Sequence, residues 1–223
     1  YDDAGRLIEQ LTLSPAVVEA GQVQGEPRPL QGTRHVADAN EVRVERMVYD
    51  NRGQARPAEL IERQVYADPS WPDKPTRIAR ASVVPGLEHS MELAYNEAGQ
   101  LIELTERGYS PIDAAGEHNP TAIARTTSWR YERINGRSVL VEVDGPLANG
   151  AQAAPSDSDI TRYRWDETGS FITSVTLPGD LATGLAHDAA GRLIRATRDD
   201  HLQSHWRYDD RGQVTHLAQP QTY

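Results

Sequence analysis

Apolar and polar side chains alternate in short stretches of this sequence, and many of these stretches end at a turn-forming segment. Rings stand at i and i+2 with an arginine between them in 129–131, 163–165 and 206–208. Successive side chains of a strand point to opposite faces, so this period indicates a strand with one apolar face. The alternation predicts short β-strands over most of the chain.

A turn motif of the form aromatic-Asp-x-x-Gly-(Arg/Gln)-(Leu/Val) follows many of these stretches. Two weaker copies begin at Ile112 and Tyr131, the second with one extra residue before its glycine. The clearer copies are 48, 46, 70, 22 and 21 residues apart and begin at Tyr1, Tyr49, Tyr95, Trp165, His187 and Tyr208. These intervals are near multiples of a unit of about 20 to 24 residues, a period typical of stacked repeats.

The motif suits a type I β-turn. Its Asp side chain can accept a backbone N–H two residues on, and its Gly accepts a positive φ without steric cost. Each unit is therefore expected to be a β-hairpin that leans on its neighbours, because a lone hairpin cannot bury its apolar face. The predicted turn residues, with every glycine at φ > 0, are Asp2, Gly5, Asp50, Gly53, Asn96, Gly99, Asp166, Gly169, Asp188, Gly191, Asp209 and Gly212.

The motif resembles the YD repeat of the RHS (rearrangement hot spot) family, whose signature is Tyr-Asp-x-x-Gly-Arg-Leu. Residues 1–7 match it at every fixed position, 187–193 depart only at the first, and 95–101 and 208–214 keep the frame with Gln for Arg. In that family, related to polymorphic-toxin and Tc-toxin shell repeats, a long β-sheet coils into a hollow shell, often around a toxic C-terminal payload. The resemblance implies a bacterial protein that is secreted, periplasmic or on the cell surface.

The expected fold class is all-β, with repeated antiparallel hairpins forming a long curved sheet, part of an RHS-type β-shell. Residues 1–143 are expected to form one YD-repeat region. Residues 144–158, rich in Gly, Pro, Ala, Ser and Asp, are expected to be a flexible loop or linker. Residues 159–223 are expected to be further hairpins, which continue the same sheet or form a second sub-domain.

Several segments give more local expectations. The first hairpin is predicted in 1–13, and a loop in 21–32 from its prolines and glycines. Residues 58–67 fit a helix or a strand, and the repeat context favours the strand. The remaining expectations are a three-strand meander in 77–84, 91–95 and 101–107, and a hairpin in 122–131 and 138–143 around Asn135-Gly136.

Composition excludes some partners and chemistries. The net charge of −10 argues against nucleic acid and anionic membranes as partners, because both select a basic face. The sequence contains no run of 18 apolar residues, so it predicts no membrane span. It also contains no cysteine, which excludes disulfides and thiolate sites. The chain begins at Tyr1 inside a repeat, so we expect a signal peptide or earlier repeats to have been removed.

No enzyme motif is recognisable, and we expect no catalytic residue, cofactor or metal. The recurring aspartates look like a carboxylate array, yet local capping of each turn explains them. His201 and His205, beside Asp199 and Asp200, would be about 13 Å apart in a strand, too far to share a metal. We interpret them as solvent-facing, and no paired-aspartate core follows the repeats to support autoproteolysis.

Two hypotheses about function follow. The first is a non-enzymatic repeat segment that forms or caps part of a β-shell, with neighbouring domains of the same polypeptide or a protein as its partner. The alternative is a free-standing binding module for carbohydrate or protein. Its candidate ligand-binding rings form a ladder if three neighbouring strands align, and an exposed ladder could stack on a ligand; we favour the core of the sheet, because arginine lies on the opposite face. These rings are Trp129, Tyr131, Tyr163, Trp165, Trp206 and Tyr208.

Overall fold

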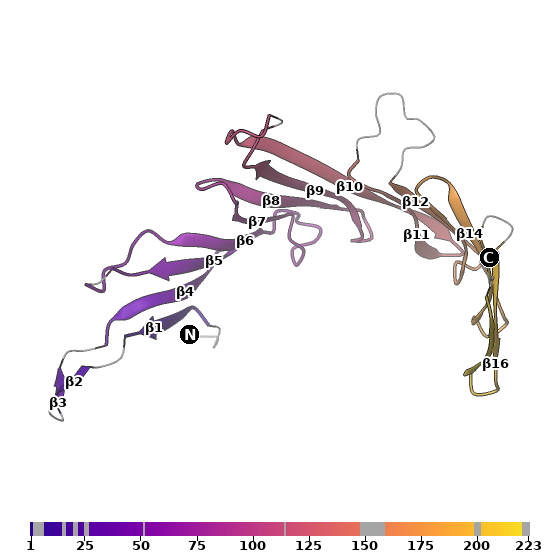
Figure 1. The fold of residues 1–223 in the computed structure, drawn as a ribbon, viewed down its shortest axis with the longest axis horizontal. Helices are drawn as coiled ribbons and strands as arrows, with labels where there is room; N and C mark the ends of the chain where they lie inside the picture. Colours follow the sequence, from indigo (N-terminus) through magenta and orange to yellow (C-terminus); the bar gives the residue numbers. More distant parts are fainter. Residues whose placement is uncertain are drawn as a thin grey trace. The chain divides into compact units, whose positions relative to one another are not determined.

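The chain folds as antiparallel strands joined by turns (Figure 1). The computed structural model describes residues 1, 7–14, 17–19, 22–24, 27–50, 52–113, 115–147, 159–198 and 202–219. No helix occurs among these residues, and all the strand pairs recorded for them are antiparallel. The predicted all-β class of repeated antiparallel hairpins is confirmed.

The first of two compact units spans 1–124. Its strands lie side by side in the order β1-β4-β5-β6-β7-β8-β9, while β2 and β3 form a separate two-stranded sheet. The strands are β1 (Glu9–Leu13), β2 (Val17–Glu19), β3 (Gln22–Gln24), β4 (Pro29–Ala37), β5 (Glu41–Val48), β6 (Glu59–Val65), β7 (Arg77–Ala81), β8 (Glu88–Tyr95) and β9 (Leu101–Ser110).

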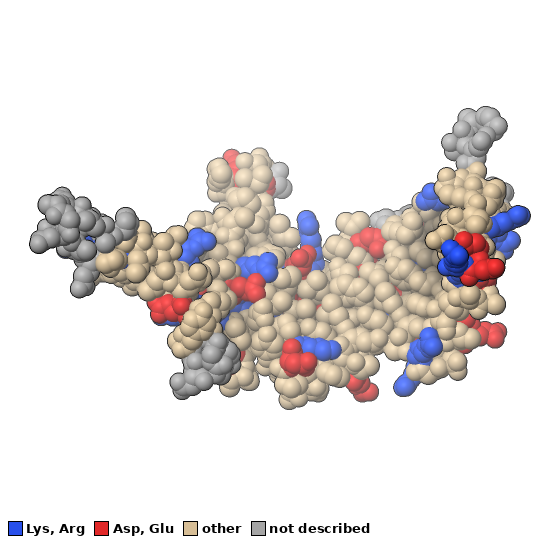
Figure 2. Space-filling model, turned by 90° about the horizontal axis from the view of Figure 1, so that it is seen from below, with Lys and Arg blue, Asp and Glu red and all other residues tan. Residues whose placement is uncertain are grey.

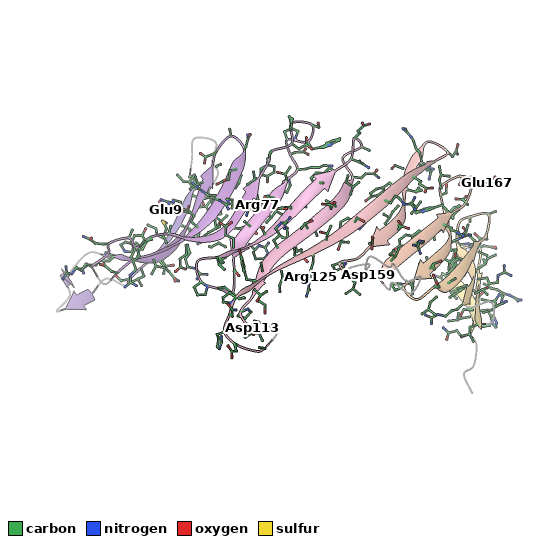
Figure 3. All side chains as sticks on the ribbon, turned by 90° about the horizontal axis from the view of Figure 1, so that it is seen from above. Glu9, Arg77, Asp113, Arg125, Asp159 and Glu167 are labelled. Carbon is green, nitrogen blue, oxygen red and sulfur yellow. The ribbon has the colours of Figure 1, made fainter. Side chains whose placement is uncertain are left out.

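The second unit spans 125–223, and its strands follow one another in chain order. Figure 3 labels Asp159 and Glu167 at the two ends of its strand β12. The strands are β10 (Thr121–Ile134), which begins within the first unit, β11 (Arg137–Asp144), β12 (Ile160–Trp165), β13 (Ile172–Leu177), β14 (Leu181–His187), β15 (Leu193–Arg198), β16 (Leu202–Tyr208) and β17 (Val214–Ala218).

Most local expectations hold. Residues 59–65 are the strand β6, the meander is β7–β9, and β10 and β11 are joined at Asn135-Gly136. The two turn residues have φ of 47° and 79°, as a two-residue hairpin turn with left-handed backbone requires. The strands on either side of the predicted linker pair with one another, with Glu142 opposite Arg162, and 148–158 lie outside the described residues.

One expectation near the N-terminus is wrong. The predicted loop 21–32 contains β3 and the start of β4, because a proline without an N–H is tolerated at the first residue of a strand, where Pro29 stands. The outgoing strand of the hairpin predicted in 1–13 is present as β1, whereas the first half of that hairpin lies outside the described residues. The strand β1 pairs with β4, Glu9 lying opposite Arg34, and residues 2–6, with Asp2 and Gly5, are among those the structure does not describe.

A β-bulge follows the turns at Asn96, Asp188 and Asp209, a feature the repeat motif does not reveal. The first residue after the turn pairs with the last residue before it, and the register then shifts by one. Such bulges bend the strand and increase its twist. The pairs next to the shifts are Tyr95↔Leu101, His187↔Leu193 and Tyr208↔Val214.

The sheets have little core. Among the described residues the buried apolar side chains are Met47, Ala79, Val139 and Val141. Ala79 is buried because it stands in a cross-strand row between Arg63 and Ser90, and the long arginine side chain covers its small neighbours. Burial here comes from neighbouring side chains on one layer of strands and not from a second layer.

Candidate functional site

The repeated turn is held by one side-chain oxygen. In the last hairpin, Oδ1 of Asp209 accepts backbone N–H groups from Arg211 at 2.9 Å and from Gln213 at 2.8 Å. The N–H of Gly212 donates to the carbonyl oxygen of Asp209 at 3.0 Å, which closes the β-turn. Oδ1 makes the same pair of contacts, two and four residues on, at Asp50, Asn96, Asp113 and Asp188.

Two variants of the motif test this geometry. Asn96 replaces the aspartate and still accepts N–H groups from Ala98 and Gln100 at 2.9 Å, so the oxygen matters and the charge does not. The weak copy at Asp113 also forms the regular turn, with Gly116 at φ 83°. The other weak copy, at Tyr131, instead forms the two-residue Asn-Gly turn described above.

The positive φ predicted for the turn glycines is confirmed wherever the structure describes them. The values are 78° at Gly53, 71° at Gly99, 65° at Gly169, 81° at Gly191 and 80° at Gly212. A side chain at these positions is strained because its Cβ crowds the backbone in the left-handed region. The turn thus selects glycine through the backbone.

Several turn carboxylates accept hydrogen bonds from groups of their own turn, and these bonds lower their pKa. Hydrogen bonds from the Thr168 hydroxyl and from backbone N–H groups lower the pKa of Asp166 to about 2. Backbone N–H groups likewise hold the pKa of Asp50, Asp113 and Asp188 below the usual value, the largest contribution coming from Gln54, Glu117 and Arg192 respectively. A carboxylate stabilised in its charged form is a poor general acid or base near neutral pH.

Side-chain contacts join each hairpin of the second unit to the one before it. Nε1 of Trp165 donates to the carbonyl oxygen of Leu140 at 2.8 Å. The hydroxyl of Tyr208 donates to the carbonyl oxygen of Leu193 at 2.7 Å. In the hairpin between them His187 takes the aromatic position, and its ring stacks on Phe171 at 5.3 Å. We call these contacts the inter-hairpin staples.

Arginine completes one staple. Arg192 forms an ion pair with Asp188 at 2.7 Å, and its guanidinium lies 4.8 Å from the ring centroid of Tyr208. Nη1 of Arg192 also donates to the carbonyl oxygen of Asp209 at 3.3 Å. The arginine that defines the repeat signature therefore links its own turn to the next one.

A similar staple in the first unit uses the segment between β6 and β7. The hydroxyl of Tyr95 donates to the carbonyl oxygen of Pro75 at 3.0 Å, and Nε1 of Trp71 donates to that of Asn96 at 3.2 Å. Nζ of Lys74 lies over the rings of Trp71 and Tyr95 and donates to the carbonyl oxygen of Gly99. The repeat motif does not reveal these contacts, although a tryptophan between Pro69 and Pro72 was a usable signal.

The six candidate ligand-binding rings do not form one ladder. They lie on β10, β12 and β16, which are not neighbours: β11 separates the first two, and β13–β15 separate the last two. All six rings are half-buried, so they form neither a deep core nor a fully open face. Nε1 of Trp165 and the hydroxyl of Tyr208 already donate hydrogen bonds in the inter-hairpin staples. Carbohydrate binding stays a prediction that no contact here supports.

Charged side chains pair across the strands. Arg63 and Arg77 both contact Glu88, at 2.7 and 3.3 Å, and Arg107 contacts Glu92 at 3.1 Å. In Figure 2 blue and red groups accordingly stand next to one another in small clusters. Exposed pairs of this kind contribute little to stability, but in each of them an arginine stands beside a carboxylate of opposite charge.

Three clefts lie on the sheets. One of about 730 Å³ lies beside the start of β6 and the β7–β8 connection, and one of about 460 Å³ lies over β7–β9. The third, of about 680 Å³, lies on the strands β14–β17 and is named here the C-terminal cleft. Its lining includes Ala186, Arg195, His205, Arg207, His216 and Ala218.

Neither a cluster of metal ligands nor a long apolar helix is found among the described residues. No group of three or more His, Asp or Glu side chains among them could hold a metal ion. His205 is exposed on β16 and its Nε2 lies 3.2 Å from Oε1 of Gln203, while 199–201 lie outside the described part. In the same set of residues there is no long apolar helix of the kind that crosses a bilayer.

Comparison with known proteins yields a distant structural neighbour. No protein-family model and no curated protein matches the chain. Among solved structures, the chain is similar to the crystal structure of TcdB2-TccC3-Cdc42, with 14% sequence identity and a TM-score of 0.38. The match covers 97% of this chain, which spans only 14% of the length of that chain. The fold and its staples define the class: an all-β protein built from repeated antiparallel hairpins.

Proposed function

We propose that this chain is a non-enzymatic structural segment of a YD-repeat protein, whose hairpins form or cap part of a β-shell that covers another polypeptide. On this proposal its partner is a neighbouring domain or a bound protein, outside the cytoplasm. The repeats, the staples and the exposed apolar surface support it.

The staples support a wall-building role because they use the recurring geometry of each turn to hold the next hairpin. The aromatic position of one repeat bonds to the backbone of the preceding one through Trp165 and Tyr208. Contacts limited to neighbours let such an array grow by repetition, as in other repeat proteins. The turns therefore organise a surface and leave no reactive group at their centre.

The observation that carries the proposal is the exposed surface. The accessible surface of this 24.7 kDa chain is 15792 Å². A compact monomer of that mass exposes about 10,000 Å², and two compact halves together expose about 12,000 Å². The excess includes many large apolar side chains, among them Leu11, Leu13, Leu30, Ile123, Phe171, Leu177 and Leu181. Such surface normally marks a binding face.

A structure of the longest natural polypeptide that contains this sequence tests the proposal. We expect the sheet to be part of a wall, with Leu13, Leu30, Leu177 and Leu181 covered by other residues of the assembly. The matched control is the set of charged side chains Arg80, Arg107 and Arg130, which carry ion pairs already and are expected to keep more of their exposure. Both faces of both units open to solvent would contradict it.

A further inference from the structure

We propose that the C-terminal cleft binds an extended acidic peptide whose carboxylate side chains stand at alternate positions, held mainly by Arg195 and Arg207. This goes beyond the scaffold proposal, because it concerns one face of β14–β17 whether or not that face belongs to a wall. A failure of one proposal leaves the other standing.

The charges of the two other clefts are already paired. In the cleft over β7–β9, Arg77 contacts Glu88 at 3.3 Å and Arg107 contacts Glu92 at 3.1 Å. In the cleft beside β6, Arg80 contacts Glu62 at 2.7 Å. A ligand with net charge gains little at such sites, because each charge it could use is held by a neighbour of opposite sign.

The C-terminal cleft differs in having cationic and neutral lining only. The strand register places Ala186, Arg195, His205 and Ala218 in one row across β14–β17. Arg207 lies two residues from His205, hence on the same face, and it pairs with His216 of β17. The lining contains no carboxylate. Two arginines and two histidines therefore share one face of an otherwise acidic chain.

The two arginines are available for a ligand. Both are exposed on their strands, and within the described part of the chain neither has a side-chain ion pair or hydrogen bond. Among the described carboxylates near them in sequence, Asp188 and Asp209 belong to the turns and accept backbone N–H groups there, while Asp199 and Asp200 lie outside the described residues. Unlike Arg192, which Asp188 holds, Arg195 and Arg207 thus have no carboxylate partner among the described residues.

An extended peptide fits the spacing of these groups. Arg195 and Arg207 are diagonal neighbours on adjacent strands, ~7–8 Å apart at their Cα atoms, which is close to the ~7 Å repeat of alternate side chains in an extended ligand. Ala186 and Ala218 stand at the two ends of the row, on either side of Arg195 and His205, so small side chains flank the cations and a peptide can approach them closely. Arginine forks bind carboxylates in a bidentate manner, and complementary charge sets the register of the ligand.

Binding of a synthetic peptide tests this inference. The probe is a fluorescein-labelled decapeptide of alternating Glu and Ser, and the matched control peptide has Gln in place of Glu. Anisotropy is measured with the full chain at about 50 mM salt, where exposed charges are weakly screened. We expect the glutamate peptide to bind at least about tenfold more tightly than the glutamine peptide, and this preference to shrink at about 0.5 M salt. Equal binding of both peptides would overturn the proposal.

Variants then locate the site. The double variant Arg195→Gln/Arg207→Gln should weaken binding of the glutamate peptide about fivefold or more, and Arg195→Lys/Arg207→Lys should weaken it less. Arg133→Gln, an exposed arginine of β10 outside the cleft, removes a like charge and should change binding less than about twofold. Circular dichroism and the urea midpoint must match the parent for each variant.

Two results would refute the location or the ligand class. If Arg133→Gln weakened binding as much as the double variant, the attraction would be general charge and not the cleft. If a labelled thymidine decamer bound more tightly than the glutamate peptide and lost its binding in the double glutamine variant, the cleft would be a nucleic-acid site instead.

Discussion

Gly191 lies directly against the ring of Phe171, so that a Cβ built on Gly191 would stand 2.5 Å from Cε1 of that ring. The ring in turn stacks on His187, the residue in the aromatic position of the same hairpin as Gly191. The turn of one hairpin is thus packed by a residue of the hairpin before it. Gly212 has an almost equal φ, 80° against 81°, yet nothing lies within 4 Å of its Cβ position.

This pair separates backbone strain from loss of packing. Gly212→Val should cost roughly 1 to 3 kcal/mol in the free energy of unfolding, because a β-branched residue is strained at this φ. Gly191→Val should cost about 1 to 3 kcal/mol more, since the Phe171 ring must move. Urea unfolding of both variants measures the difference. Equal costs would show that the Phe171 contact contributes nothing, and no cost in either would refute the turn geometry.

The oxygen of the turn aspartate should matter more than its charge. Asp209→Asn should change the free energy of unfolding by less than about 0.5 kcal/mol, because an amide oxygen can accept the same two N–H groups, as Asn96 does. Asp209→Ala should cost about 1 to 2 kcal/mol, since both N–H groups lose their acceptor. Thermal unfolding of the two variants decides the matter, and a larger loss for Asn than for Ala would contradict it.

The motif predicted the turns because their chemistry is local. The turn at Asp209 is made by a side-chain oxygen, two backbone N–H groups two and four residues on, and a glycine at φ > 0. All of them lie between Asp209 and Gln213, so a short motif is enough to predict the turn. The strand order could also be predicted, since consecutive hairpins pair with their neighbours from β4 onward. The strand β1 could not be placed in this way, because it pairs with β4 and not with the next strand in the chain.

The contacts between hairpins could not be predicted from the sequence pattern. A ring at the end of a strand looks the same whether it is stacked, buried or bonded, and only the register shows that Trp165 reaches Leu140 and Tyr208 reaches Leu193. The C-terminal cleft depends on the bulge as well. Without the register shift near His187, the side chains of Arg195 and Ala186 would not share a row.

Acid should weaken the protein through the turn carboxylates. The folded pKa of Asp166 is about 2, below the value near 3.9 of an unfolded aspartate. A group with a depressed folded pKa stabilises the fold above its unfolded pKa, and this contribution is lost as the pH falls from about 4 toward 2. Asp50, Asp113 and Asp188 shift in the same direction. The stability against urea should therefore decline over this interval.

Asp166→Asn is the matched control for this acid effect. It keeps an oxygen in the turn and removes the titrating carboxylate. Its stability should fall less steeply than that of the parent as the pH falls from about 4 to about 2, because unfolding of the variant takes up one proton fewer. An NMR titration of the parent should place the Asp166 carboxyl pKa well below that of an exposed aspartate. A midpoint near 4, the usual value for an aspartate, would contradict the hydrogen bonds from Thr168 and the backbone.

The staples should couple neighbouring hairpins, and Tyr208 offers the cleanest test. Tyr208→Phe removes only the hydroxyl that donates to the carbonyl oxygen of Leu193, while the ring under Arg192 remains. The loss should be about 0.5 to 1.5 kcal/mol, the usual net value of one hydrogen bond. Hydrogen exchange should report faster opening of β16 and β17, with β7–β9 unchanged, because the contact joins adjacent hairpins only. The control is Tyr163→Phe, whose hydroxyl has no hydrogen bond recorded within the described residues. If both variants opened β16 and β17 equally, the Tyr208 contact would not be what holds the last hairpin to the one before it.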